Sequence, residues 1–320
     1  MRRFLATRLV AALVTGLGIT LLAFAVVRAA PGDPIALQSD LGLRSGEATL
    51  QQIRAYRRLM GLDAPFLPGY LRWLWHLLRG DLGRSFRDGR PVLSILAEAL
   101  PVTLLLSIMS LLLGYALAIP AGILSAARPG GWIDRSISTI SFLLYSLPVQ
   151  WVALVLVVWP AGLPIHGLHS EGTRSLRDLL AHLVLPVTCL TYASVAVTSR
   201  FVRSSMLEEM GRDYVRTARA KGLPDSAVIL RHALPNSLLS LITLFGLTFP
   251  ALASGAVIVE RIFGLPGMGK LTFDAVLGRD VPVLMGAVTL AGAVTMLGTL
   301  ASDILYAVAD QRNSLAGARQ

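Results

Sequence analysis

The sequence predicts an all-α polytopic membrane protein with six transmembrane helices. Two properties of the composition indicate this class. Of the 320 residues, 54% are hydrophobic and only 15% are charged, whereas a soluble globular domain has about 25% charged residues. The mean hydropathy is +0.64, and the charged residues separate long uncharged runs. A lipid bilayer is therefore the expected solvent for most of the chain.

Six uncharged runs are long enough to cross a membrane, because a helix needs about 20 residues to span the hydrocarbon layer. They are residues 9–27, 99–127, 136–165, 179–199, 233–259 and 281–302. The second and third runs are long enough to include an interfacial turn. The first exceeds the usual apolar length of a signal peptide, and no small-x-small cleavage site follows it. We therefore interpret it as an anchoring helix.

The segments between these runs divide the chain into four predicted parts. Residues 1–28 comprise a short tail and the first helix, and residues 29–98 form a long extracytoplasmic loop. Within that loop, residues 47–60 and 69–79 are predicted helices, and the second is amphipathic and rich in Trp and Leu, which suits a membrane interface. Residues 99–308 form a five-helix core that includes a loop at 200–236, and residues 309–320 are a tail.

Proline residues recur within the apolar runs, at Pro101, Pro120, Pro148, Pro186 and Pro250, and glycine residues accompany them. Glycine lets helices approach closely in lipid. Proline kinks helices or marks their ends, and kinks at membrane depth are tolerated where helices line a cavity. This combination favours a transporter over a simple anchor.

The distribution of Lys and Arg over the short loops predicts the orientation. Fourteen bases fall on the side that holds both termini, the loop around residues 128–135 and the loop at 200–236. Five fall on the opposite side when the long first loop is left out. Both termini and the 200–236 loop are therefore predicted to be cytoplasmic.

Residues 208–238 form one of the few long polar stretches and predict a short, rigid helical segment. Asp213 lies near the start of the first expected helix and bases lie toward its end, which complements the helix dipole. Gly222 suits the position after that helix, and Pro224 prevents continuation. Asp225 is then expected to cap a second helix that runs to about Ala233. The alternative is a solvated loop with helix-forming residues.

The sequence GLPGMGK at residues 264–270 fits the skeleton of a phosphate-binding loop. However, the hydroxyl that would bind Mg²⁺ arrives one position late, at Thr272. A Gly/Pro-rich turn between two membrane helices is the better interpretation. His166 and His169 form H-x-x-H without a third ligand at usable spacing, so no metal site is expected.

The remaining patterns point away from enzymes and nucleic-acid binding. Cys189 is the single cysteine and lies in an apolar run, where it is expected to be a packing residue. His182 stands alone at a helix end. No catalytic constellation of residues is present, and the bases flank apolar runs without an aromatic-basic platform.

The loop sequence DYVRTARAKGLPDSAVILRHALPN resembles the EAA loop of permeases in binding-protein-dependent ABC importers, in the form of the dipeptide/oligopeptide/nickel family. The family's small-residue helix start, glycine and Leu-Pro pair fall here on residues 216–218, Gly222 and Leu234-Pro235. The leading Glu of the general pattern is Arg216, as is usual in the peptide branch.

Other motifs of the family follow in the family's order along nearly the whole chain. They are PGDP at 31–34, GLDAP at 61–65, RGDLGRSF at 79–86, RPV at 90–92, LPVTLLL at 100–106, and an outer segment at 257–283 with a Pro-Gly-x-Gly turn. The tail departs from the pattern, because it has ADQRNS at 309–314 where the family usually has Asp-Pro-Arg.

This resemblance implies the type I ABC importer permease fold and a peptide permease B-type subunit in the bacterial inner membrane. Such a subunit forms half of the translocation path for di- or oligopeptides. The implied partners are a second homologous permease, two ATPase subunits, an extracytoplasmic solute-binding protein and the bilayer. ATP and Mg²⁺ would be bound by the ATPase subunits, and this chain would hold no cofactor and no catalytic residue.

The resemblance also assigns contact with the ATPase subunits to the cytoplasmic loop, where small Ala218 and Ala220 would allow close seating. The implied coupling residues are Asp213, Tyr214, Arg216, Thr217, Ala218, Ala220, Lys221, Gly222, Leu234 and Pro235. Pro148, Gln150 and Ser254 are candidate positions in the translocation path. The same architecture could instead import nickel, glutathione or another small solute. A passive channel or a membrane scaffold is the alternative from a different class.

Overall fold

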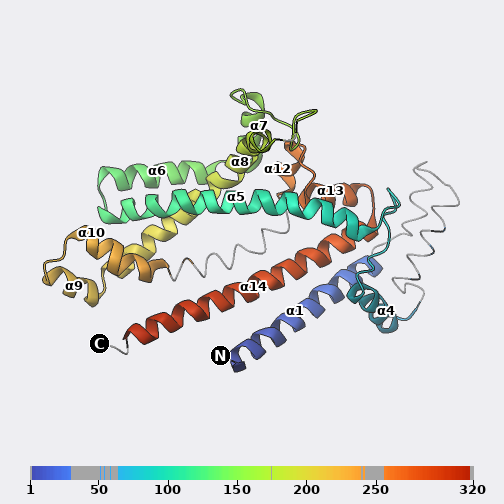
Figure 1. Ribbon diagram of the computed structural model, residues 1–320, viewed down its shortest axis with the longest axis horizontal. Coiled ribbons are helices and arrows are strands. Elements are labelled where there is room, and N and C mark those ends of the chain that lie inside the picture. The colour runs from blue at the N-terminus through green and yellow to red at the C-terminus, as the bar shows by residue number, and fades with distance from the viewer. Residues whose placement is uncertain are drawn as a thin grey trace. The chain divides into compact units, whose positions relative to one another are not determined.

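The computed structural model is built from helices, as predicted (Figure 1). It describes residues 2–29, 64–173, 175–238 and 256–317, together with residues 51, 54, 58 and 241. The described elements are joined by turns and by a β-bridge between Arg84 and Pro91. The chain divides into two compact units, which are described separately.

The first unit contains the chain up to Leu104 and residues Pro266–Leu297. Its helices are α1 (Arg2–Ala29), α4 (Phe66–Leu78), the beginning of α5 (Val92–Ala127), α13 (Met268–Leu277) and the beginning of α14 (Val281–Gly317). An aromatic cluster forms one part of its core. Phe24 of α1 is fully buried, and its ring centroid lies 5.7 Å from that of Tyr70 and 5.8 Å from that of Trp73 in α4.

Helix α1 packs closely against α14 because glycine lies at the contact. A Cβ placed on Gly292 would lie 2.8 Å from the side chain of Ile19, so a larger residue there would force the two helices apart. Tyr70 adds a polar tie, because its hydroxyl lies 2.9 Å from that of Thr20 on α1. Helix α4 is therefore held against α1 by both apolar and polar contacts.

The predicted amphipathic helix at residues 69–79 is α4, which begins three residues earlier, at Phe66, and ends at Leu78. Its apolar face, which includes Trp73, is buried, whereas Trp75 is exposed. Gly80 follows with φ +75, a conformation that glycine adopts without steric cost. The helix predicted at residues 47–60 lies almost wholly outside the described residues.

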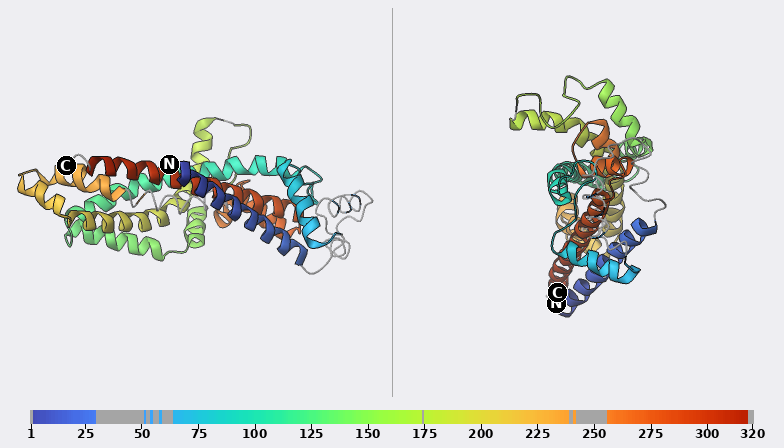
Figure 2. Two further views of the ribbon diagram at one scale, coloured as in Figure 1. Left: turned by 90° about the horizontal axis from the view of Figure 1, so that it is seen from below. Right: turned by 90° about the vertical axis from the view of Figure 1, so that its right-hand side faces the viewer.

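The second unit contains α6 (Trp132–Ser146), α7 (Val149–Val158), α8 (Leu176–Met210), α9 (Asp213–Ala220), α10 (Asp225–Ala227) and α12 (Val257–Ile262). The end of α5 crosses α8 very closely. A Cβ on Gly122 would lie 2.5 Å from Cβ of Val202 and 2.7 Å from the carbonyl oxygen of Ser199. In Figures 1 and 2, α9 and α10 lie at the end of this unit where α5 ends and α6 begins.

The third apolar run is not one straight helix. Helices α6 and α7 meet at an angle of 90°, with Leu147 and Pro148 at the break. Proline disfavours the α conformation in the residue before it, and Leu147 is extended, with ψ 122. Helix α8 supports the break, because the Tyr192 hydroxyl donates to the carbonyl oxygen of Leu147 at 2.7 Å. The run at residues 136–165 therefore holds two helices that meet at Pro148, one of the prolines expected to kink helices or mark their ends.

Several helices extend beyond their apolar runs. Helix α8 continues to Met210 although the run ends at residue 199, so the first part of the predicted 200–236 loop is helical. Helix α5 begins at Val92 rather than at residue 99, and α14 continues to Gly317.

Three helices of the described residues are long and apolar enough to cross a membrane: α5, α8 and the Val281–Ala301 part of α14. The α6–α7 pair would be a fourth span if the two bent segments count as one. Helix α1 contributes a shorter apolar stretch, Leu13–Val26. Most of the run at residues 233–259 lies outside the described residues.

Candidate functional site

The predicted polar helix of the 208–238 segment is α9, and its ends are fixed as the sequence predicts. Asp213 lies in its first turn and Arg219 in its last, so both charges complement the helix dipole. Gly222 follows with φ +77, and its amide donates to the carbonyl oxygen of Arg219 at 2.9 Å. This left-handed glycine ends the helix and reverses the chain.

One face of α9 is buried against the chain that follows it. Val215, Ala218 and Val228 form a small cluster in which Val215 and Val228 are fully buried and Ala218 is 5% exposed. Ala218 therefore packs against Val228 of the same chain and helps to hold α9 in place. This differs from the expectation that Ala218 faces a partner, because a side chain three residues after Val215 lies on the same buried face.

Tyr214 connects α9 to the helices on both sides of it. Its hydroxyl donates to Oε2 of Glu209 in α8 at 2.6 Å and accepts a hydrogen bond from Nδ2 of Asn236 at 3.0 Å. Burial and the hydrogen bond to the Glu209 carboxylate raise the pKa of Tyr214 above its ordinary value. The raised pKa favours the protonated phenol, which is the form that donates to Glu209.

The second predicted helix begins differently from the expectation. Asp225 is the first residue of α10, the N-cap position is Pro224, and no side chain caps this end. Residues Val228–Ala233 form a π-helix, and the chain remains helical to Leu238. The π-helix ends two residues before Pro235, which has no amide hydrogen for an α-helical bond. Such π segments frequently occur at functional sites.

The opposite face of α9 is exposed and predominantly polar. It presents Asp213, Tyr214, Arg216, Thr217, Arg219, Ala220 and Lys221. Arg216 lies 3.5 Å from Asp213, and both are largely exposed, so this ion pair contributes little to stability. Nine of the ten predicted coupling residues are exposed or half-buried, and Ala218 is the buried one. Leu234 is half-buried and Pro235 is exposed.

A partly buried ion pair that the sequence analysis did not predict joins α8 to α6. Arg203 of α8 donates from Nε to Oδ1 of Asp134 at 2.7 Å and from Nη2 to Oδ2 at 2.8 Å. The amide of Gly130 donates to Oδ2 at 2.8 Å, and the hydroxyl of Ser125 donates to Oδ1. The only signal in the sequence was an acid three residues after the Pro-Gly-Gly turn that follows the second apolar run.

The three candidate path residues have different outcomes. Pro148 is the N-cap residue of α7, at the break between α6 and α7, and Gln150 is in the first turn of α7. Both are exposed. Ser254 lies outside the described residues. The structure therefore brings Pro148 and Gln150 to one bend and leaves their relation to Ser254 undescribed.

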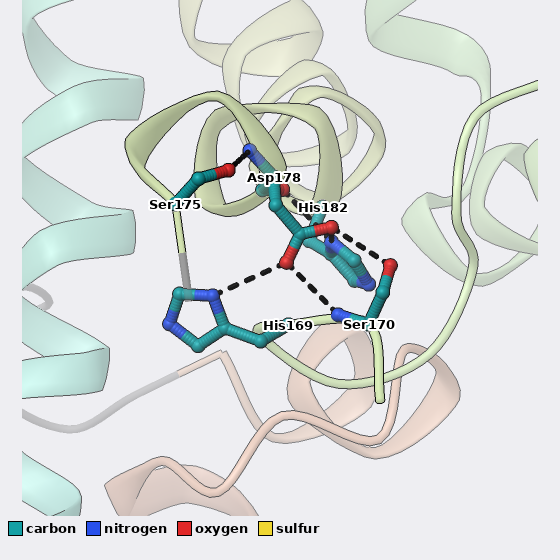
Figure 3. A network of polar contacts seen from close by, with 5 residues as sticks. All are labelled: His169, Ser170, Ser175, Asp178 and His182. Carbon is teal, nitrogen blue, oxygen red and sulfur yellow. Dashed lines mark hydrogen bonds and ion pairs between the residues drawn. The ribbon is translucent and has the colours of Figure 1, made fainter. Parts of the chain in front are cut away.

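His169, the second histidine of H-x-x-H, belongs to a polar cluster at the start of α8 (Figure 3). His169 lies 3.3 Å from Oδ2 of Asp178, and Ser170 donates to the same carboxylate from its amide and its hydroxyl. His182, predicted to stand alone, lies 2.8 Å from the backbone oxygen of Asp178.

This cluster anchors the loop before α8. Ser175 caps the helix by accepting from the amide of Asp178 at 3.1 Å. Within the described residues, no group of three or more His, Cys, Asp or Glu side chains is arranged to hold a metal ion.

The phosphate-loop skeleton at residues 264–270 forms a turn and the start of α13. Gly264 has φ +64, and Gly267 is the N-cap residue of α13. The first amide of that helix, at Met268, donates to Oγ1 of Thr103 in α5 at 2.7 Å. The amide that a phosphate would need is thus bound within the chain, in agreement with the interpretation as a turn.

These features define a class of protein: a multi-pass helical membrane protein in which a short helix with an exposed polar face follows the long helix α8, and in which the described residues form no catalytic constellation. A family model described as the inner membrane component of binding-protein-dependent transport systems matches residues 118–315. A second, for the N-terminal part of such membrane components, matches residues 1–107.

The chain is similar to curated proteins over nearly its full length. It is 40% identical over 305 residues to the oligopeptide transport system permease protein AppB of Bacillus subtilis, covering 92% of this chain and 94% of that protein. It is 35% identical over 341 residues to the dipeptide transport system permease protein DppB of Escherichia coli, covering 98% of each.

The fold is similar to that of a solved transporter. A chain of the MetNI methionine ABC transporter, in an inward-facing conformation, matches with a TM-score of 0.54 and 20% identity, covering 67% of this chain and 96% of that chain.

The chain belongs to the family of binding-protein-dependent transport system inner membrane components. It is a multi-pass permease subunit of an ABC importer complex and is not the ATPase subunit.

Proposed function

We propose that this chain forms half of the translocation path of an ATP-driven importer for di- and oligopeptides, as a B-type permease subunit. The similarity to permeases whose names specify dipeptide and oligopeptide transport supports the peptide substrate. The family match, the six uncharged runs and the distribution of Lys and Arg over the short loops support a type I importer architecture with six transmembrane helices and both termini in the cytoplasm. The fifth of those helices would arise from the run at residues 233–259.

The proposed partners are a second homologous permease, two ATPase subunits and an extracytoplasmic solute-binding protein. ATP and Mg²⁺ would be bound by the ATPase subunits. In this arrangement, α9 sits in a groove on an ATPase subunit and transmits the closure of the two ATPases to the membrane helices. This is a rigid-body switch between two packings.

The observation that carries the coupling role is the way in which α9 is fixed. Its buried face is seated on Val228, Tyr214 ties it to Glu209 and Asn236, and Gly222 fixes its end. Its polar face is left exposed. A short helix held on three sides moves with its support, so a force applied to the exposed face is transmitted rather than absorbed.

We further propose that the break between α6 and α7 borders the translocation path. Pro148 frees backbone groups there, and irregular backbone at membrane depth is tolerated where it lines a cavity. Gln150, one residue beyond the helix start at Val149, supplies an amide that can hydrogen bond a peptide backbone. Ser254 would contribute from the fifth helix.

Uptake of labelled di- and oligopeptides by cells with and without this chain tests the substrate, with nickel uptake measured in parallel. Loss of ATP-dependent peptide uptake is the expected result. Loss of nickel uptake alone would assign the chain to the metal branch of the family. Solute flux without ATP would instead indicate a passive channel.

The coupling role is tested with Ala220→Trp, because Ala220 lies on the exposed face of α9 and its replacement leaves the Val215–Val228 seat intact. We expect uptake to be lost and co-purification of the ATPase subunits to be weakened, with normal amounts of the permease in the membrane. Leu230→Trp is the matched control, because Leu230 is 56% exposed in the π-helix. Normal uptake by an assembled Ala220→Trp complex would refute the proposal.

A further inference from the structure

We propose that Asp134 and Arg203 form a clamp that makes the ends of α5, α6 and α8 move as one body with α9, so that they are positioning residues for transport. This inference rests on the proposed docking role of α9. It adds the part of the machinery that carries the motion from α9 to the membrane helices, which sequence motifs did not indicate.

The geometry of the pair suits a mechanical joint. Two different nitrogens of Arg203 bind two different oxygens of Asp134, at 2.7 and 2.8 Å. The planar guanidinium fork fixes direction as well as distance, which a lysine ammonium cannot do. Asp134 is 4% exposed, so water does not compete for its oxygens.

The same carboxylate collects donors from every segment that meets at this point. Ser125 is in the last turn of α5, Gly130 is in the turn that follows, Asp134 is in the first turn of α6, and Arg203 is in α8. Ser125, Gly130 and Arg203 all donate to the two carboxylate oxygens of Asp134. Removing the charge therefore loosens three helices from one another at once.

The clamp is continuous with the seat of α9. Val202 and Met206, on either side of Arg203 in α8, are buried with Ala126 of α5 and Ala233 of the π-helix. The hydroxyl of Ser237 contacts Sδ of Met206 at 3.0 Å. Closely packed interiors transmit displacement instead of absorbing it, so a movement of α9 reaches Arg203 through packed side chains.

Helix α6 leads from the clamp to the proposed path. It has 15 residues, or about 22 Å at 1.5 Å per residue, with Asp134 in its first turn and the break at Pro148 beyond its last. Two weaker contacts join α6 to α8 further along. Ser141 lies 3.2 Å from Ser199, and Tyr192 binds the oxygen of Leu147. Of these three contacts between α6 and α8, the Asp134–Arg203 clamp is the charged one and the one nearest to α9.

The test uses the complete complex in proteoliposomes, with the binding protein and labelled peptides. Asp134→Asn removes the charge at constant shape, and Arg203→Lys keeps the charge but removes the two-point geometry. Ser141→Ala is the matched control, since it breaks a contact between the same two helices and Ser199 retains its bond to the oxygen of Ala196. Arg200→Gln controls for loss of an exposed base on α8.

For each variant, the amount of assembled complex, the rate of ATP hydrolysis and the peptide imported per ATP are measured. We expect both clamp variants to lower peptide imported per ATP by about 2- to 30-fold, the range seen for residues that couple distant sites. Assembled complex and ATP hydrolysis per complex should remain, and the two controls should match the wild type.

An unchanged ratio of import to hydrolysis in the clamp variants would overturn the inference. The inference would also be overturned if both variants lost uptake only in proportion to the loss of assembled complex, because the pair would then serve stability alone. Ala220→Trp separates this inference from the docking role. If that variant loses uptake while the clamp variants couple normally, the clamp is rejected and the docking role is kept. The reverse pattern rejects the docking role, and with it the link between the clamp and α9.

Discussion

The hydroxyl of Ser85 donates a hydrogen bond to the carboxylate of Asp280, which lies 195 positions later in the chain. The same carboxylate accepts from the amides of Phe86 and Arg87, at 3.2 and 3.4 Å. Ser85 is 1% and Asp280 is 4% exposed. This contact joins the RGDLGRSF motif to the segment that begins α14, so one buried carboxylate holds together two distant family motifs.

We expect Asp280→Ala to lower the free energy of unfolding by about 3 kcal/mol, because it leaves a buried hydroxyl and backbone amides without an acceptor. Ser85→Ala should cost about 1 kcal/mol, since its removal leaves the carboxylate with other donors. Equilibrium unfolding in mixed detergent measures both changes. Asp81→Ala is the control, because the Asp81 side chain is 51% exposed; an equal loss in that variant would contradict the role of Asp280.

Gly122 is expected to be intolerant of even one added methyl group. In Gly122→Ala the new Cβ would meet Val202 and the backbone of Ser199 at less than contact distance, and overpacking of this kind costs about 1–3 kcal/mol. The thermal unfolding temperature of the purified permease reports the effect. Gly18→Ala is the matched control on α1, since its Cβ would meet nothing within 4 Å. A Gly122→Ala protein as stable as that control would show that α5 and α8 do not cross so closely.

Substitutions at Gly222 should reduce uptake more strongly the less readily the new residue adopts a positive φ. At φ +77, asparagine is tolerated best, and alanine and valine follow, because a left-handed conformation costs most L-residues roughly 1–2 kcal/mol. Gly222→Pro should abolish uptake, since proline cannot adopt a positive φ and lacks the amide that binds the oxygen of Arg219.

Uptake assays on normalised amounts of membrane complex measure this series. Gly172→Ala is the control, since Gly172 also has a positive φ, of +75, but lies in the loop before α8. If that variant loses as much uptake as Gly222→Ala, backbone strain anywhere in the chain would explain the result, and the special role of the α9 end would be rejected.

Labelling with a membrane-impermeant thiol reagent should reveal the orientation. Cys189 is the single cysteine and is 1% exposed, so the wild type should remain unlabelled. Lys221→Cys should react only after the cells are permeabilised, because the exposed end of α9 is predicted to be cytoplasmic. Gly172→Cys should react in intact cells. Labelling of Lys221→Cys in intact cells would reverse the predicted topology.

Much of the candidate site could be predicted because its signals are local. The beginning and end of α9 follow from Asp213, the bases of its last turn and Gly222, all within one short segment. Dipole and capping effects act over one helical turn. The same local signals were less reliable for the next helix, α10. Its N-cap residue is Pro224 and no side chain caps it, although Asp225 was expected to, and a π-helix follows.

The amino-acid sequence was enough to predict the helical membrane class, the position of most apolar helices and the short helix α9, because composition and periodicity act along the chain. It did not reveal that Asp134 binds Arg203, 69 positions away, that Ser85 binds Asp280, or that Ala218 faces its own chain, and these pairings became visible in the folded structure. Ion pairs and close packing depend on which helices meet in space. A charge in a sequence does not specify its partner, and a small residue does not specify which neighbour it allows to approach.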